Sequence, residues 1–148
     1  MIRTKPDLPS RSTTPASPVV ECLVSCRPEG AVYAGFWEFP GGKAHCSESV
    51  VACAVREARE ELGIEIEPIE PLPVVRHRYP HAHVALHPHL SRLTPTSPEP
   101  ADLAVASHQW VEIADLVDSD FPEGNRPILA HLRARDAAGG LAGLLQGA

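Results

Sequence analysis

The chain has little positive charge for its length. Its 148 residues include 13 Lys and Arg against 19 Asp and Glu, which gives a formal net charge of −6. Proteins that bind nucleic-acid polymers usually present a basic face, so the composition argues against that class. The sequence also has no run of about 18 apolar residues, and therefore no membrane-spanning helix is expected.

Cysteines are few and lack the spacing of a metal site. The four are Cys22, Cys26, Cys46 and Cys53, and no two of them form a C-x-x-C pair. A disulfide between Cys22 and Cys26 is not expected, because four residues of extended strand hold their Cα atoms too far apart. The thiols are therefore expected to be reduced, and the cytoplasm is the expected location.

The length is that of one domain with its own core. Residues 1–18, rich in Pro, Ser and Thr, predict a disordered tail, and residues 137–148 a flexible tail of small residues. The domain is expected to span residues 19–136 between these tails. Strands are expected near 21–27, 71–79, 82–90 and 108–112, a loop at 94–100, and helical segments near 48–62, near 113–117 and after Pro127.

The helix expected over residues 48–62 carries a cluster of carboxylates. Glu57, Glu60 and Glu61 stand at i, i+3 and i+4, so one turn of helix stacks them on one side. Ser47 or Ser49 is a candidate N-cap. Gly63 occupies the position of a left-handed C-cap.

These carboxylates are costly where they stand. Like charges at i,i+4 repel, and Glu60 and Glu61 lie near the negative end of the helix dipole. A solvated helix face is the usual reading of such a charge run. Here, however, the preceding loop WEFPGGK, residues 37–43, is rich in Gly and Pro, and its backbone can approach a ligand closely. The combination indicates a bound divalent cation, and oxygen ligands favour Mg²⁺, with Mn²⁺ possible.

The spacing of Gly42, Glu48 and the segment REAREELGI, residues 56–64, resembles the signature of the Nudix hydrolases. Only Ala58 is smaller than the residue common at its position. The resemblance implies an α/β/α sandwich with a mixed sheet, and Mg²⁺-dependent cleavage of nucleoside diphosphates linked to another moiety. It also implies a small nucleotide as the partner, with no polymer or membrane, and a monomer or dimer.

The flanking sequence resembles the MutT type of this family. LVSCRP at 23–28, HRYP at 77–80, WV at 110–111 and DFPEGN at 120–125 match its strands and loops. The resemblance implies hydrolysis of nucleoside triphosphates to NMP and pyrophosphate, with oxidised (d)NTPs such as 8-oxo-dGTP as expected substrates. The alternatives are a Nudix hydrolase of ADP-ribose or dinucleoside polyphosphates, and a catalytically silent Nudix binding module.

By this resemblance, three carboxylates and two glycines form the metal site, in which metal-activated water attacks a phosphorus. Glu48 and Arg56 would form a structural ion pair. Arg27 would reach a phosphate or the nucleoside, and the amide of Asn125 would read the purine edge. The metal ligands implied are Glu57, Glu60, Glu61, Gly41 and Gly42, and the residues implied to line the nucleotide cleft are Glu38, Phe39, Pro40 and Gly41.

Three departures from the MutT pattern affect these expectations. Ser47 replaces a loop glycine, which matters if the backbone needs a positive φ there. Ala104 stands where the family often has a loop glutamate that acts as base or further ligand. Asp102 is the preferred substitute for that base, ahead of Glu99, and a carboxylate of the helix is the other candidate. Finally, the family's first strand should begin within the N-terminal tail, where only 19–20 is strand-like, so it is expected to be short or missing, with an unpaired sheet edge.

Histidines are concentrated in one segment of the chain. His81, His83, His87 and His89 would share one face of an extended strand. A flat row rarely supplies the converging ligands of a zinc site, and Pro88 interrupts the run. Partly exposed histidines beside the cleft are therefore expected, with metal binding or base contact as the alternative.

Overall fold

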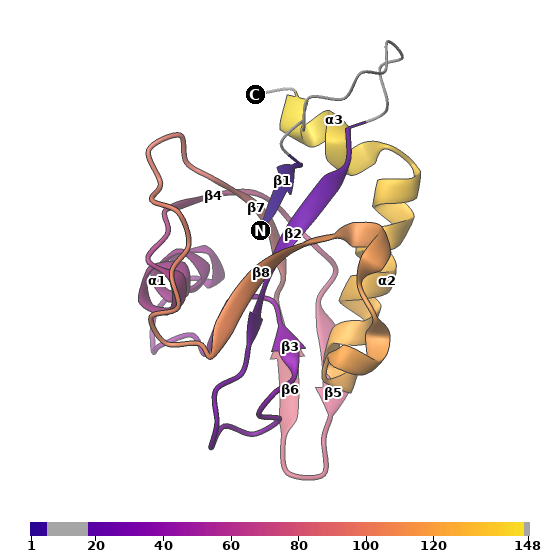
Figure 1. Ribbon diagram of the computed structural model, residues 1–148. Coiled ribbons are helices and arrows are strands. Elements are labelled where there is room, and N and C mark those ends of the chain that lie inside the picture. Colours follow the sequence, from indigo (N-terminus) through magenta and orange to yellow (C-terminus); the bar gives the residue numbers. More distant parts are fainter. Residues whose placement is uncertain (6–17, 147–148) are drawn as a thin grey trace.

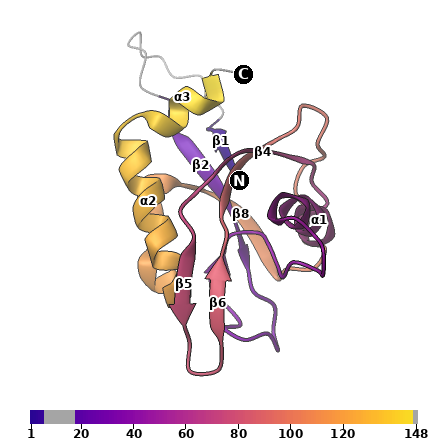
Figure 2. The same cartoon turned by 180° about the vertical axis from the view of Figure 1, so that it is seen from behind.

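A central sheet separates one helix from two others, as Figures 1 and 2 show from opposite sides. The computed structural model describes residues 1–5 and 18–146. Helix α1 (Val50–Leu62) covers one face of the sheet, and α2 (Arg126–Ala137) and α3 (Gly140–Gln146) lie on the other side. This three-layer arrangement confirms the predicted α/β class. In the described ranges, no helix combines the length and the hydropathy needed to cross a membrane.

The sheet is built around β2 (Val20–Cys26), which pairs antiparallel with three other strands. Strand β8 (Ser107–Glu112) follows one edge of β2 over six residue pairs. Strands β1 (Ile2–Thr4) and β3 (Trp37–Glu38) share the opposite edge, β1 beside the start of β2 and β3 beside its end. Enclosed on both edges, β2 is buried along almost its whole length.

Two further strand pairs lie beside this sheet. Strand β4 (Ile66–Pro71) pairs with β7 (His89–Leu93), and β5 (Val75–Arg78) forms a hairpin with β6 (His83–Leu86). The strands expected at 71–79 and 82–90 are thus shorter, and β4 was not predicted. This strand contains two prolines, which weaken the strand pattern in the sequence. They fit an irregular strand with the observed register shift.

The histidine-rich segment does not form one continuous strand. Pro88 separates β6 from β7, so His83 and His89 belong to different strand pairs, while His81 and His87 lie in the connections. The single row of four histidines was therefore a wrong expectation. Within the described residues, no group of three or more His, Cys, Asp or Glu side chains is arranged to hold a metal.

The N-terminus differs from the expected tail. Residues Ile2–Thr4 form β1, and the Ile2 side chain is only 1% exposed, packed in the main core. The first strand is therefore short, one of the two expected alternatives, but the predictions of disorder at Ile2–Thr4 and of an unpaired edge beside the start of β2 are wrong. Three residues are too few to show periodicity, and their burial depends on partners distant in the chain. Residues 6–17, the rest of that tail, lie outside the described residues.

The C-terminus shows the same kind of correction. Instead of a frayed tail over 137–148, the chain turns at Gly139, where φ is 71°, and forms α3. Leu141 of this helix is fully buried in the same core as Leu129 of α2. Gly140 and Gly143 disfavour a helix in this short segment, so packing of the leucine side chains explains it. The last two residues, 147–148, lie outside the described residues.

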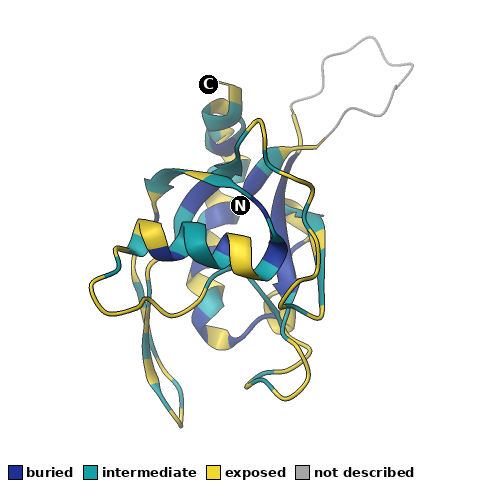
Figure 3. Cartoon of the chain, turned by 90° about the vertical axis from the view of Figure 1, so that its left-hand side faces the viewer, coloured by how far each residue is buried: buried dark blue, intermediate teal, exposed yellow. Residues whose placement is uncertain are grey.

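Side-chain alternation along β2 divides the core in two. Cys22 and Val24 face the large cluster that α2 and α3 cover. Leu23 faces the other side, where it packs against Ala58 and Leu62 of α1. Figure 3 shows the opposite, exposed face of α1 toward the viewer. The helix is thus held on the sheet by a narrow apolar stripe, which leaves its carboxylates at the edge of the contact.

Candidate active site

Both ends of α1 are capped as its sequence predicts. The hydroxyl of Ser49 accepts a hydrogen bond from the backbone N–H of Ala52 at 3.1 Å, which decides between the two candidate N-caps. Gly63 has φ 68°, and its N–H donates to the carbonyl of Arg59 at 3.0 Å. These caps fix which residues form the last turn, and hence the direction in which the carboxylates leave the helix.

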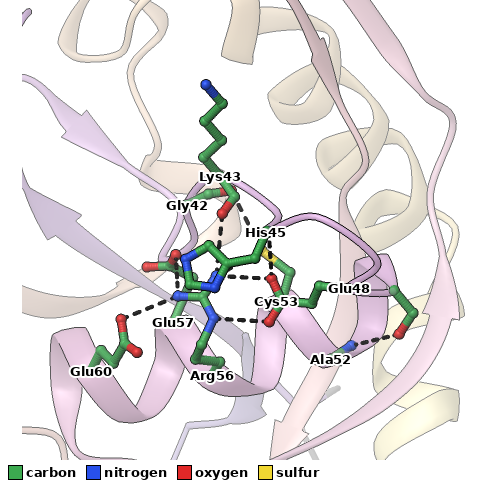
Figure 4. Close-up of polar contacts among 10 residues, drawn as sticks. Gly42, Lys43, His45, Glu48, Ala52, Cys53, Arg56, Glu57 and Glu60 are labelled. Carbon is green, nitrogen blue, oxygen red and sulfur yellow. Dashed lines mark hydrogen bonds and ion pairs between the residues drawn. The ribbon is translucent and has the colours of Figure 1, made fainter.

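An ion pair ties the glycine loop to α1. The Arg56 guanidinium donates to both carboxylate oxygens of Glu48, at 2.8 and 3.0 Å, and to the carbonyl of Lys43 at 3.2 Å (Figure 4). Glu48 also accepts from the backbone N–H of His45. The bond from Arg56, and then that from His45, lower the pKa of Glu48 from 4.5 to about 2. The loop is therefore pinned to the helix at several points.

Ser47 keeps the backbone conformation that glycine would favour. Its φ is 66°, in the left-handed region, although serine carries a Cβ. Serine thus occupies a left-handed position in this loop, and the strain costs on the order of 1 kcal/mol for an L-residue.

Glu57 and Gly42 are in close contact. A Cβ added at Gly42 would lie 2.3 Å from the carboxylate carbon of Glu57, so only glycine fits while the carboxylate holds this position. Glu57 accepts a hydrogen bond from Arg56 at 2.7 Å. The loop backbone and this carboxylate thus approach each other as a shared ligand site requires.

Glu61 lies on the same side of α1, facing the loop. Its carboxylate accepts a hydrogen bond from the backbone N–H of Gly41 at 3.1 Å. Burial, together with the nearby charges of Glu38 and Glu57, raises the pKa of Glu61 to about 7, and the bond from Gly41 and the charge of Arg27 only partly oppose this. A carboxylate whose charge is disfavoured in this way is a good receptor for a cation.

Glu60 is arranged differently from the other two carboxylates. Its side chain is 58% exposed, and it accepts from Arg56 at 3.1 Å on the outer side of α1 (Figure 4). Glu57 accepts from the same guanidinium nitrogen of Arg56 at 2.7 Å, so Arg56 holds the carboxylates of Glu57 and Glu60 next to each other. Glu61 is held separately, by its bond to the backbone of Gly41.

Arg27 is engaged with protein groups. Its guanidinium pairs with the carboxylate of Glu38 and donates to the carbonyl of Val32 at 2.6 Å. Burial raises the pKa of Glu38, and the attraction of Arg27 opposes it. The two residues implied as nucleotide contacts are therefore brought together as a partner pair, close to Glu61.

The residues near Asn125 lie beside the glycine loop. The ring of Phe121 contacts that of Phe39, with centroids 5.5 Å apart. The N–H of Gly124 donates to the hydroxyl of Tyr79 at 2.9 Å. Asn125 is the N-cap residue of α2, and among the described contacts its side chain makes no capping hydrogen bond. Its amide therefore keeps its donor and acceptor for a ligand.

Asp102, the predicted base, has a histidine partner that the sequence reasoning missed. The Nδ1 atom of His108 in β8 lies 2.5 Å from a carboxylate oxygen of Asp102. The loop that carries Asp102 is attached to the end of α1, because the N–H groups of Leu103 and Ala104 donate to the carbonyl of Glu61 at 3.1 and 3.2 Å. In the sequence, the only indication of this pair was a histidine in the predicted strand, six residues after Asp102.

Comparison with known proteins agrees with this geometry. The model of the NUDIX domain matches residues 20–131. The 8-oxo-dGTP diphosphatase of Escherichia coli (strain K12) is 29% identical over 113 residues, which are 76% of this chain and 86% of that protein. The enzyme of the same name from Proteus vulgaris is 38% identical over 64 residues, 43% of this chain and 57% of that protein.

A solved structure shows the same fold. The crystal structure of a MutT NUDIX hydrolase from Burkholderia pseudomallei superimposes with a TM-score of 0.65 at 28% identity, covering 74% of this chain and 86% of that one. The matched region contains the glycine loop, α1 and the segment with Asp102. The chain belongs to the NUDIX domain family and is a MutT-like Nudix hydrolase.

Proposed function

We propose that this protein hydrolyses nucleoside triphosphates to NMP and pyrophosphate with a divalent cation, and that oxidised (d)NTPs such as 8-oxo-dGTP are its substrates. One observation carries the proposal. Two carboxylates face the glycine loop: Glu61 accepts a hydrogen bond from the N–H of Gly41, and Glu57 lies so close to Gly42 that no side chain would fit there. The names of the Escherichia coli and Proteus vulgaris relatives support the substrate class.

The residues fit a hard cation by their chemistry. Glu57 and Glu61, with a carbonyl of the Gly41–Gly42 pair, offer oxygen donors, which Mg²⁺ and Mn²⁺ prefer. Arg56 holds the carboxylate of Glu60 next to that of Glu57, where it offers a further oxygen donor. When bound, the cation supplies charge neutralisation for the phosphates and activation of water.

The remaining residues bind and orient the nucleotide. Asn125, with its free amide, offers a donor and an acceptor to a purine edge. Phe39 and Phe121, in mutual contact, provide apolar surface next to it. Arg27 is held ready by Glu38, and it can turn to a phosphate at the cost of that pair. A free nucleotide in the cytoplasm needs no basic face, in keeping with the net charge of −6.

A panel of nucleotides with Mg²⁺ tests the proposal, with pyrophosphate and phosphate measured separately. Turnover of 8-oxo-dGTP above that of dGTP, with pyrophosphate as product, is the expected result. Asn125→Ala should lower kcat/KM for 8-oxo-dGTP by about tenfold or more, the loss typical of one base contact. Cleavage of ADP-ribose or a dinucleoside polyphosphate instead would overturn the substrate assignment.

The metal site is tested by Glu61→Gln. We expect turnover to fall about a hundredfold or more, the size of effect that loss of one electrostatic contact to a transition state often has. Glu67→Gln is the matched control, since Glu67 is half-exposed and pairs only with Arg92 in the neighbouring strand. Mn²⁺ affinity, measured by electron paramagnetic resonance, should fall for Glu61→Gln alone. Equal turnover in both variants would contradict the assignment.

A further inference from the structure

A row of three residues crosses the sheet beneath the proposed metal site. Ser25 of β2 is paired with His108 of β8 on one side and with Glu38 of β3 on the other. Directly paired residues on neighbouring strands project to the same face. Leu23, two residues before Ser25, projects to that face and packs against Leu62 of α1. The row therefore lies on the α1 side of the sheet.

The row is linked to Glu61 of α1 at both ends. At one end, Glu38 is close enough to Glu61 to raise its pKa. At the other end, His108 is bonded to Asp102, whose loop donates two backbone hydrogen bonds to the carbonyl of Glu61. Glu61 thus lies over the row, with the His108–Asp102 pair beside it.

The middle of the row contains an unsatisfied polar group. Ser25 is 0% exposed, and its hydroxyl finds no hydrogen-bond partner among the residues that the structure describes. A buried hydroxyl without a partner costs about 1–3 kcal/mol, and such groups often mark a site that a ligand or an ordered water completes. This hydroxyl lies between His108 and Glu38, next to the proposed site.

The hydrogen bond to Asp102 fixes the state of the imidazole. An ionised carboxylate only accepts hydrogen bonds, so in the neutral imidazole the proton is on Nδ1 and the lone pair is on Nε2. In the described part of the chain no hydrogen bond engages Nε2, and the His108 side chain is 22% exposed. A neutral imidazole held in one tautomer by a carboxylate is the arrangement of a general base.

We propose that His108, oriented by Asp102, is the general base of this enzyme and takes the role left open at Ala104. The inference rests on the proposed function. Nε2 of His108 accepts a proton from the attacking water while the water oxygen bonds to a phosphorus of the triphosphate. The anhydride bond between the α and β phosphates breaks, and its electron pair leaves with pyrophosphate if the α phosphorus is attacked or with NMP if the β phosphorus is attacked. The imidazolium then returns its proton to solvent.

His108→Asn tests the base directly. The amide of Asn keeps a donor near the position of Nδ1 and so retains the contact to Asp102, but it lacks Nε2. We expect kcat to fall about a hundredfold, at the low end of general-base effects, with KM and Mn²⁺ affinity unchanged. His87→Asn is the matched control, because His87 is exposed in the connection between β6 and β7. Its kcat should equal that of the wild type.

Asp102→Asn separates this mechanism from its two competitors. Loss of kcat in Asp102→Asn with full activity in His108→Asn would make Asp102 itself the base and overturn the inference. Full activity in both variants would reduce the pair to a loop contact and overturn it as well. Parallel losses in both variants, with unchanged thermal stability, support it.

A spectroscopic readout is independent of turnover. In ¹⁵N NMR of the metal-free protein, recorded at a pH high enough for the imidazole to be neutral, His108 should show a protonated Nδ1 and an unprotonated Nε2, and Asp102→Asn should change this tautomer. A protonated Nε2 in the wild type would overturn the inference. A wild type without any nucleotide turnover would sink the proposed function, while this measurement would still decide the tautomer.

Discussion

The two ends of the sheet are stabilised in different ways. Around the glycine loop and α1, the contacts are charged: Arg56 with Glu48, and Glu61 with the Gly41 backbone. Where β1 meets α3, the contacts are apolar, with Ile2 and Leu141 in one core. Burial of apolar side chains supplies most of the free energy of folding, whereas the charged end holds groups whose burial is costly.

We call the region where β1 meets α3 the terminal end, and the region of the glycine loop and α1 the site end. The comparison indicates that the terminal end stabilises the fold, whereas several groups at the site end lower its stability. Three features of the site end oppose folding: the positive φ of Ser47, the unpartnered hydroxyl of Ser25, and the raised pKa of Glu61. Functional sites commonly contain such strained or unsatisfied groups. Substitutions that remove one of the first two features should therefore raise stability, whereas truncation of the apolar core should lower it.

The largest change in stability is expected for a substitution in β1. Ile2→Ala removes a side chain that is 1% exposed, and it should lower the free energy of unfolding by about 3 kcal/mol, within the range for such truncations. Chemical denaturation monitored by circular dichroism measures it. Val19→Ala, at a residue 42% exposed, is the control and should change stability little. Equal effects of the two would mean that β1 does not stabilise the fold.

Glu48→Gln should cause a smaller loss of stability, and the size of this loss should depend on pH. A carboxylate whose pKa is depressed stabilises the fold above its ordinary pKa of 4.5, and this contribution is lost as the pH falls toward about 2. The melting temperature of Glu48→Gln should therefore lie below that of the wild type at pH 7, and the difference should shrink between pH 4.5 and pH 2. A constant difference across this window would show that the charge is not responsible.

Ser25→Ala should change stability in the opposite direction. Removing a buried hydroxyl without a partner should raise the free energy of unfolding by about 1 kcal/mol. Turnover should fall, because the hydroxyl between His108 and Glu38 beneath the proposed site is lost. Denaturation and steady-state kinetics on the same preparation measure both. A loss of stability would mean that an ordered water already satisfies the hydroxyl.

The smallest change in stability is expected for Ser47→Gly. Glycine adopts φ 66° without strain, so the variant should gain about 0.5 kcal/mol, since the greater freedom of glycine in the unfolded chain offsets part of the relief. Differential scanning calorimetry can resolve this change. Ser49→Gly is the contrasting variant, because it removes the N-cap bond to Ala52 and should lower stability. A loss in both would show that Ser47 makes a contact of its own.

The sequence alone determined α1, its family and the pairing of Glu48 with Arg56. These depend on spacing within one helix and its preceding loop, where residues at i, i+3 and i+4 must share a face whatever surrounds them. Gly63 and Ser49 cap the helix for equally local reasons. Sequence similarity then identified the family because the same positions are matched in its relatives.

Only the tertiary structure decided the rest. Ile2 and Leu141 form ordered elements because residues far along the chain bury them, and no local pattern contains that information. The hydrogen bonds of one Arg56 nitrogen to both Glu57 and Glu60 depend on the side-chain positions that the fold sets. Likewise, Ser25 and His108 are 83 positions apart, and antiparallel pairing of β2 with β8 places them side by side. Helical spacing is local, whereas strand register and side-chain partners are set by the whole fold.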